Sequence, residues 1–173
     1  GYSGGRSEFS PLTINVDANS SLSQQLLEYA ASGRHIPSIE LEGVTSDGQT
    51  VYDLLLGDVV VTRVQDASTG QDVLQFTYGQ VSVTTTGQDE MGRRTEPSTF
   101  TWNVATNEEG VNIREPRAGE GDPAGGGAQN YYLTIDRVAG DSNREGQEGA
   151  FDVSGYSFDI SSIVEATRGA GYS

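Results

Sequence analysis

A two-residue alternation of apolar and polar side chains constrains this chain most, because it predicts β-strands. Residues 12–16 read Leu-Thr-Ile-Asn-Val, and residues 39–42 read Ile-Glu-Leu-Glu. The dipeptide Asp47-Gly48, which is typical of a hairpin turn, separates the second segment from an apolar run that starts at Val51. Alternation turns one face of each strand toward a core, so we expect a mainly β fold.

The longest predicted strands each contain an interior glycine, and the apolar pattern shifts around the second of these, Gly79. The run from Val51 continues through Gly57 to Val64, and a second long strand extends over residues 73–86 around Gly79. A glycine inside a strand is typical of a bulge or bend. We therefore expect both strands to curve.

Three consecutive leucines, Leu54, Leu55 and Leu56, give the first long strand two apolar faces. Successive side chains of a strand point to opposite faces, so one face is expected to fill the core. The other face is expected to contact a neighbouring subunit, and Leu54 and Leu56 are the predicted contact residues. The alternative is a strand whose outer face is covered by a helix of the same chain.

One segment has the helical period. Leu22 and Leu26 lie on one face of a short amphipathic helix. Ser21 with Gln24 matches a capping box at its start, and Gly33 is expected to end it.

The composition of the chain divides it into three parts. Residues 1–104 form the larger β-rich part, and residues 105–129 are a Gly-, Pro- and Glu-rich linker. Residues 130–173 contain a predicted hairpin of strands 132–135 and 151–160. Two strands alone are marginally stable in water, so this hairpin must complete the first part or a neighbouring copy of it.

The charge balance excludes several classes of partner. Ten basic residues, all arginine, stand against 25 acidic ones, which gives a net charge of −15. Nucleic acids and anionic membranes attract Lys and Arg, so neither is an expected partner. The chain has no cysteine and no lysine, which excludes disulfides, thiolate metal sites and a Walker-type phosphate loop.

No catalytic residues and no cofactor are expected. The single histidine, His35, is the only possible imidazole base, and no nucleophile-elbow pattern accompanies it. We expect a structural role for it.

A weak candidate for a calcium loop begins at Asp141. Oxygen-bearing side chains recur at alternate positions, and an acid follows eleven residues after the first. No helices are expected to flank the segment, so a solvated polar loop is the favoured interpretation. The candidate ligands are Asp141, Asn143, Glu145 and Asp152.

Residues 32–37, Ser-Gly-Arg-His-Ile-Pro, stand between the predicted helix and the long apolar hairpin. This arrangement resembles the haemolysin-coregulated protein (Hcp) family, the tube proteins of type VI secretion systems. Four other stretches also resemble strands of that family: 76–83, 101–104, 132–135 and 151–158. Their order is rotated, because the strands matched by 131–163 come first in the family.

The resemblance implies a curved β-barrel or sandwich of two sheets with one short α-helix. It also implies six-membered rings that stack head to tail into a hollow tube with room for lumenal cargo, and a secreted, extracellular location. The partner would be the protein itself. The rotated order has three explanations: a circular permutation, a repeat unit of a tandem polyprotein, or a hairpin exchanged with a neighbouring subunit.

The ends of the chain favour the repeat unit, because both read Gly-Tyr-Ser. In the family the corresponding loop extends toward the next ring, so we expect the ends to lie at the stacking contact. The residues concerned are Gly1, Tyr2, Ser3, Arg6, Arg168 and Tyr172.

Three functions follow from these observations. The favoured one is a structural subunit that assembles into an extracellular tube or filament, as tandem Hcp-like repeats. The second is a conventional type VI secretion tube or effector carrier. The third is a small β-sandwich that binds carbohydrate or acts as a hydrolase.

Overall fold

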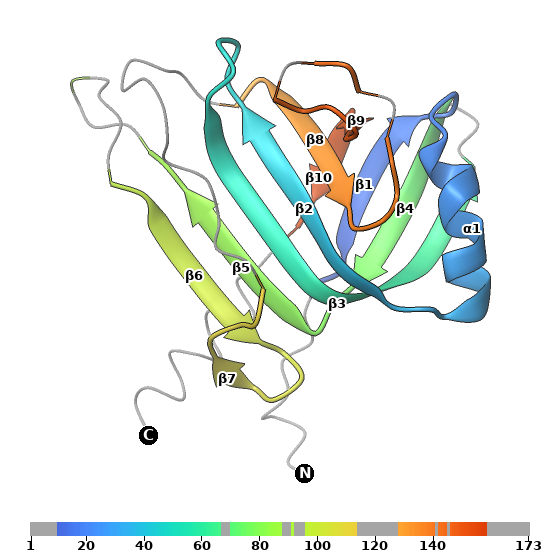
Figure 1. Ribbon diagram of the computed structural model, residues 1–173, viewed down its shortest axis with the longest axis horizontal. Helices are drawn as coiled ribbons and strands as arrows, with labels where there is room; N and C mark the ends of the chain where they lie inside the picture. Colours follow the sequence, from blue (N-terminus) through green and yellow to red (C-terminus); the bar gives the residue numbers. More distant parts are fainter. Residues whose placement is uncertain are drawn as a thin grey trace.

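The computed structural model describes residues 10–66, 70–87, 91, 96–113, 128–140, 142–144 and 146–158. This part of the chain holds one helix and ten strands, most of them antiparallel neighbours (Figure 1). In chain order they are β1 (Leu12–Asp17), α1 (Leu22–Ser32), β2 (Ile36–Val44), β3 (Thr50–Asp66), β4 (Gln71–Thr77), β5 (Gln80–Thr85), β6 (Ser98–Asn103), β7 (Glu108–Glu109), β8 (Asn130–Ile135), β9 (Phe151–Val153) and β10 (Gly155–Ser157).

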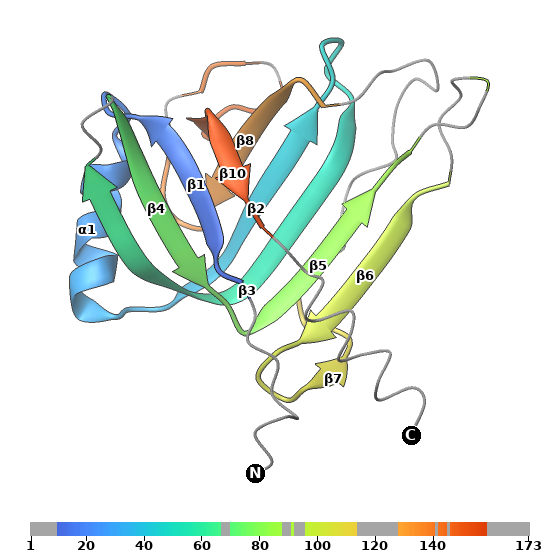
Figure 2. The ribbon, with the colours of Figure 1, turned by 180° about the vertical axis from the view of Figure 1, so that it is seen from behind.

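Seven of the strands form a curved path whose two end strands, β9 and β10, are consecutive in the chain. Their order is β10-β1-β4-β3-β2-β8-β9, and only Ser154 separates β9 from β10 along the chain. The backbone N–H of Ser154 donates to the carbonyl oxygen of Asn15 in β1 at 2.9 Å. The segment 151–157 thus pairs with β8 at one end and with β1 at the other (Figure 2). The predicted mainly β, curved fold with one short helix is confirmed.

The long strand β3 belongs to both sides of this barrel and bends at its middle. Its first half pairs with β2 and β5, and its second half pairs with β4. Asp58 at the bend has a φ of 52°. The N–H of Gly79 donates to the carbonyl oxygens of Gly57 and Asp58 at 2.9 and 3.1 Å. The second long strand predicted from the sequence is therefore two strands, β4 and β5, which follow the two halves of β3.

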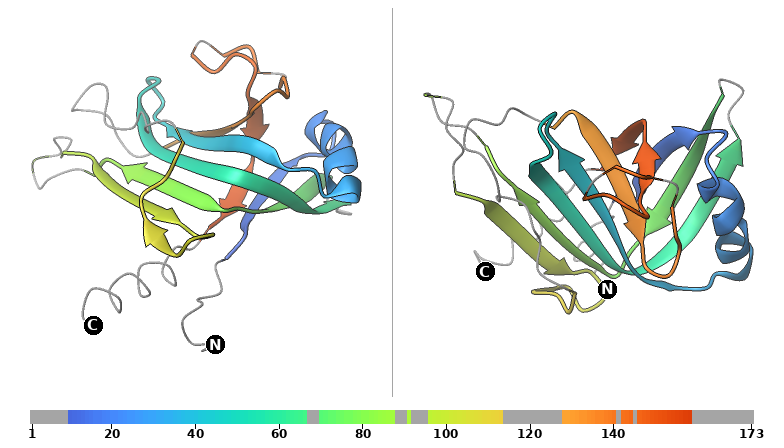
Figure 3. Two further views of the ribbon diagram at one scale, coloured as in Figure 1. Left: turned by 60° about the horizontal axis from the view of Figure 1, so that its bottom comes forward. Right: turned by 45° about the horizontal axis from the view of Figure 1, so that its top comes forward.

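β5, β6 and β7 leave the barrel and form what we call the flap. β5 pairs with the first half of β3, β6 pairs with β5, and β7 pairs with the end of β6. The flap projects on the side of the barrel opposite to α1 (Figure 3).

The two faces of β3 have different surroundings. Leu54 and Leu56 are at most 1% exposed and belong to the main core, together with Phe76, Leu133 and Phe151. These two leucines were expected to contact a neighbouring subunit, and this expectation is corrected, because their side chains fill the chain's own barrel. Leu55 points to the opposite face.

The helix packs against β3 through its apolar face, with Leu22 and Leu26 fully buried. Gly33 ends it with a φ of 70°, as predicted. The start differs from the prediction: Ser21 makes no side-chain capping bond, and the hydroxyl of Ser20 accepts from the N–H of Leu22 at 3.2 Å. Ser21 has helical backbone angles, whereas a capping side chain requires an extended backbone.

The parts predicted as linker and second hairpin both contact the body of the chain. The predicted linker, 105–129, begins with β7, which pairs with Trp102 and Asn103 of β6, and residues 114–127 lie outside the described residues. β8 pairs with β2, and β10 pairs with β1 rather than extending the pairing of β9 with β8.

Candidate assembly surface

The two longer strands of the flap are uncharged in a strongly acidic protein, while the short β7 carries Glu108 and Glu109. β5 reads Gln-Val-Ser-Val-Thr-Thr and β6 reads Ser-Thr-Phe-Thr-Trp-Asn, so neither strand carries a charged side chain. The chain as a whole has 10 basic and 25 acidic residues. Two copies of an acidic protein repel each other least where their surfaces are uncharged. The flap is therefore a suitable place for contact between copies.

The outer edge of β6 is only partly paired. β7 pairs with Trp102 and Asn103, and among the described strands no other lies along residues 98–101 on that side. Ser98 and Thr99 are exposed, while Phe100 is half-buried. An uncovered edge presents a row of backbone N–H and C=O groups that another strand can pair with.

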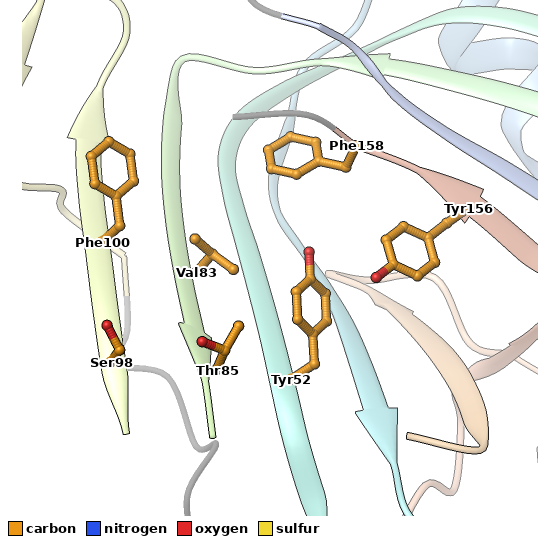
Figure 4. A pocket seen from close by; sticks show the side chains of 7 residues that line it. All are labelled: Tyr52, Val83, Thr85, Ser98, Phe100, Tyr156 and Phe158. Carbon is orange, nitrogen blue, oxygen red and sulfur yellow. The ribbon is translucent and has the colours of Figure 1, made fainter. Parts of the chain in front are cut away.

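A pocket of about 340 Å³ lies between the flap and the barrel. Val83 and Thr85 of β5 lie between β6 side chains on one side and aromatic side chains of the barrel on the other (Figure 4). None of the lining side chains is charged. They are Tyr52, Val83, Thr85, Ser98, Phe100, Tyr156 and Phe158.

Aromatic rings form the barrel side of this pocket. The ring of Tyr156 lies 5.7 Å from that of Tyr52 and 4.8 Å from that of Tyr131, centroid to centroid. The rings of Tyr78 and Phe158 are 5.7 Å apart. These distances are typical of favourable aromatic pairs.

Burial keeps the tyrosine hydroxyls of this cluster protonated. Desolvation is the main cause that raises the pKa of Tyr52 and the only one for Tyr78, and it raises the pKa of Tyr156 to about 12. Neighbouring Tyr131 and Tyr156 hydroxyls raise the Tyr52 pKa further. The pocket therefore offers neutral hydroxyls and ring faces to whatever enters it.

The outer face of β2 and β3 is buried within the chain. Glu40, Glu42 and Asp53 are at most 6% exposed, and Leu55 on the same face is 2% exposed. The Glu42 carboxylate accepts from the hydroxyl of Thr50 at 3.1 Å. Alternation predicts that these acids face away from the core, but it does not show that they are covered. This face is closed to a neighbour, in contrast to the flap.

His35 lies beside the bend of β3. Its Nδ1 is 2.5 Å from a carboxylate oxygen of Asp58, and the two side chains are 60% and 56% exposed. The pair connects the segment after α1 to the bend and is consistent with the structural role expected for His35.

The calcium candidates are only partly within the described residues. Asp141 and Glu145 lie outside them, Asn143 is exposed, and Asp152 lies on β9 opposite Tyr132. The guanidinium of Arg144, in the same loop, donates to the Tyr132 hydroxyl at 2.7 Å. A search of the described residues finds no group of three His, Cys, Asp or Glu that could hold a metal ion.

The predicted stacking residues are also outside the part that the structure describes. They are Gly1, Tyr2, Ser3, Arg6, Arg168 and Tyr172. The described helix is too short to cross a bilayer, and the search for a membrane-spanning helix in that part of the chain finds none.

Comparison with known proteins relates the first part of the chain to one family. A family model described as "Type VI secretion system effector, Hcp" matches residues 1–85, which end at the last residue of β5. No curated protein matches the chain in sequence.

A solved structure with a TM-score above 0.5 has a similar fold. A "type six secretion system protein" has 21% sequence identity and a TM-score of 0.51, and the alignment covers 64% of this chain and 73% of that one. Hcp1 from Salmonella typhimurium has 19% identity and a TM-score of 0.45 over 58% and 72% of the two chains. Hcp3 from Pseudomonas aeruginosa has 21% identity and a TM-score of 0.40 over 54% and 64%. Residues 1–85, just under half of the chain, thus match the Hcp family of type VI secretion proteins, and the fold resembles that of a type six secretion system protein.

Proposed function

We propose that the chain is a secreted structural subunit that assembles through rings and head-to-tail stacking into an extracellular hollow tube or filament. The single observation that carries this proposal is the match of residues 1–85 to the Hcp family model. The fold supports it, because β5 and β6 project from the barrel as two uncharged strands that a neighbouring copy can contact.

Assembly by a repeated contact between two different surfaces gives a ring when the rotation closes and a filament when it does not. Such a subunit needs no catalytic group, and its partner is another copy of itself. The hollow centre of a ring would have room for cargo.

The two chain ends are the proposed stacking contacts. Gly1, Tyr2, Ser3 and Arg6 at one end, with Arg168 and Tyr172 at the other, would meet the next ring. We further propose that the chain is one repeat of a tandem array, since the segments that resemble the opening strands of the family, 132–135 and 151–158, come last here. The mass of the native protein, measured by mass spectrometry, tests the array: a multiple of about 18.4 kDa supports it.

Electron microscopy of the purified protein is the direct test of the tube. Hollow particles with barrel-sized subunits are expected. Monodisperse monomers over a range of concentration and salt would overturn the proposal. A variant that lacks residues 1–7 and 168–173 should keep rings and lose stacking, whereas unchanged tubes would remove the ends from the contact.

The conventional type VI tube or effector carrier is the close alternative. It shares the ring and the lumen, but it needs neither covalent repeats nor extended polymers. Isolated short rings that retain a bound protein through purification would favour it over a long extracellular tube.

A second candidate function is binding of a neutral carbohydrate in the pocket. Its rings and hydroxyls suit a sugar, because pyranose faces stack on aromatic rings and sugar hydroxyls pair with Tyr, Ser and Thr hydroxyls. The lining has no carboxylate, so it supports binding rather than hydrolysis. Calorimetric titration with neutral oligosaccharides tests this, with Tyr156→Ala expected to abolish binding and Tyr29→Ala to leave it intact. Absence of any heat of binding in the unmodified protein would exclude this function.

A further inference from the structure

We propose that β6 pairs antiparallel with β6 of a second copy about a two-fold axis, with Thr99 opposite Thr99. This contact goes beyond the proposed tube, because a two-fold contact closes on itself and joins copies in pairs. It would link two rings or two tubes rather than lengthen one.

The edge of β6 lacks the usual protection against pairing. Natural edge strands are commonly short or carry charged residues or proline. Residues 98–101 read Ser-Thr-Phe-Thr and contain neither, and Pro97 only precedes them. Since Thr99 and Phe100 belong to residue types that favour strands, the segment is suited to receive another strand.

The charge of the protein favours a second copy of the flap at this edge. Two chains of net charge −15 repel each other over most orientations. Pairing through β6 brings together the uncharged strands β5 and β6 of both copies, with the acidic β7 at the end of each β6. Because a strand paired antiparallel with its own copy is self-complementary, a single surface supplies both sides of the contact.

The faces of β6 restrict the register. Ser98 and Phe100 point into the pocket, whereas the Thr99 hydroxyl is 2.8 Å from the Thr84 hydroxyl on the opposite face. Directly opposite residues of an antiparallel pair share a face of the sheet. A register in which Phe100 of one copy lies opposite Thr99 of the other would therefore place Phe100 on the face away from the pocket. Only registers in which the pocket-facing residues of the two copies lie on the same face of the joined sheet keep that face continuous.

The position of β7 removes one of the remaining registers. Phe100 opposite Phe100 would place Ser98 opposite Trp102, whose edge Glu109 of β7 already occupies. With Thr99 opposite Thr99, Ser98 lies opposite Phe100 and the pairing stops before Trp102. This is the register with the longest overlap that respects both constraints. In it each copy adds Ser98 and Phe100 to the rim of the other copy's pocket.

Single-cysteine cross-linking tests the register directly, because the natural chain has no cysteine. In Thr99→Cys, the two introduced residues would have Cα atoms about 4.5–5.5 Å apart, within the range of about 4.4–6.8 Å that a disulfide spans. Thr101→Cys is the matched control on the same face of β6. Two copies of residue 101 would be offset by four residues, which is about 13 Å along the strand.

Under mild oxidation Thr99→Cys should form a disulfide dimer at least about tenfold faster than Thr101→Cys. Equal rates, or a faster Thr101→Cys, would overturn the proposal.

Sedimentation of Thr99→Lys gives a second measurement, since two lysines placed opposite each other repel. Thr99→Lys should dissociate the pairs, while Thr62→Lys, at an exposed position of β3, should leave them intact. Pairs that survive Thr99→Lys would contradict the proposal.

The cross-linking result tests the β6 pairing separately from the proposed tube. Tubes in micrographs of Thr99→Cys without a rapid cross-link would overturn the β6 pairing and leave the tube function standing. Cross-linked pairs without tubes would support the pairing and count against the tube.

Discussion

A buried carboxylate connects the helix to the barrel. Asp72 of β4 is 3% exposed and accepts from the hydroxyl of Ser23, in the first turn of α1, at 2.5 Å. A negative charge near the start of a helix is also favourable for the helix dipole.

Asp72→Ala should therefore lower the free energy of unfolding by about 1–3 kcal/mol, since it leaves a buried hydroxyl without its partner. Asp66→Ala is the matched control, because Asp66 is exposed and lies directly opposite Asp72 in β3. It should change stability by less than about 0.5 kcal/mol. Urea unfolding measures both, and equal losses would show that the Ser23 contact contributes nothing specific.

The tyrosine cluster predicts a loss of stability at high pH. Burial raises the pKa of Tyr52, Tyr78 and Tyr156, to about 12 for Tyr156. Below about pH 10 both the folded and the unfolded chain keep these phenols protonated. As the pH rises further, the unfolded chain loses its protons first, so the free energy of unfolding falls.

Urea unfolding at pH 8, 10 and 11 measures this decline. Tyr52→Phe removes an ionising group and should make the decline shallower. Phe100→Leu, which alters the same pocket without a titrating group, should lower stability equally at each pH. An unchanged slope in Tyr52→Phe would contradict the assigned role of its burial.

At the level of elements, the loop between β8 and β9 depends on one close backbone approach. The N–H of Gly140 donates to the carbonyl oxygen of Gly149 at 2.7 Å. A Cβ atom at position 140 would lie 2.2 Å from the carbonyl oxygen of Ala150 and 2.4 Å from its carbon. Because both atoms belong to the backbone, no side-chain rotation relieves the clash.

Gly140→Ala should destabilise the protein by about 3 kcal/mol, the upper end of the cost of overpacking. It should also increase hydrogen exchange in β9, which pairs with β8 directly after this loop. Gly155→Ala is the control, since its Cβ would meet only the side-chain nitrogen of Asn15, at 3.3 Å. A thermal midpoint that falls equally in both variants would show that the loop tolerates the added atom.

The sequence predicts single elements better than it predicts their partners. Alternation predicts β1 and β2. The interior glycine Gly57 marks where β3 bends, and the phase shift at Gly79 marks where β4 gives way to β5. Three consecutive leucines show that both faces of β3 are buried, but not which face belongs to the core.

The pocket could not be predicted, because it combines residues from β3, β5, β6 and the β10 end of the chain. The division of segment 151–157 between β8 and β1 also depends on tertiary pairing. Neither has a local pattern in the sequence. The motif at residues 32–37 nevertheless led to the family whose model matches residues 1–85, because it joins a short helix to the long β hairpin.

At the level of the whole molecule, the net charge of −15 opposes any contact between copies. Salt shortens the range of this repulsion, from a Debye length of about 30 Å at 0.01 M to about 3 Å at 1 M. An interface made by β5 and β6 contains no ion pairs for salt to weaken, because neither strand carries a charged residue. Association between copies should therefore strengthen as sodium chloride is added.

Sedimentation velocity at 10 mM and 500 mM sodium chloride measures this dependence. Association that weakens with salt would mean that the ten arginines form ion pairs across the interface, and the flap would not be the main contact.

Calcium chloride at matched ionic strength separates screening from specific binding. Oxygen ligands in a loop at 141–152 would respond to calcium and not to sodium, since a hard divalent cation needs several carboxylate or carbonyl oxygens. Equal effects of the two salts would leave screening of the acidic surface as the cause.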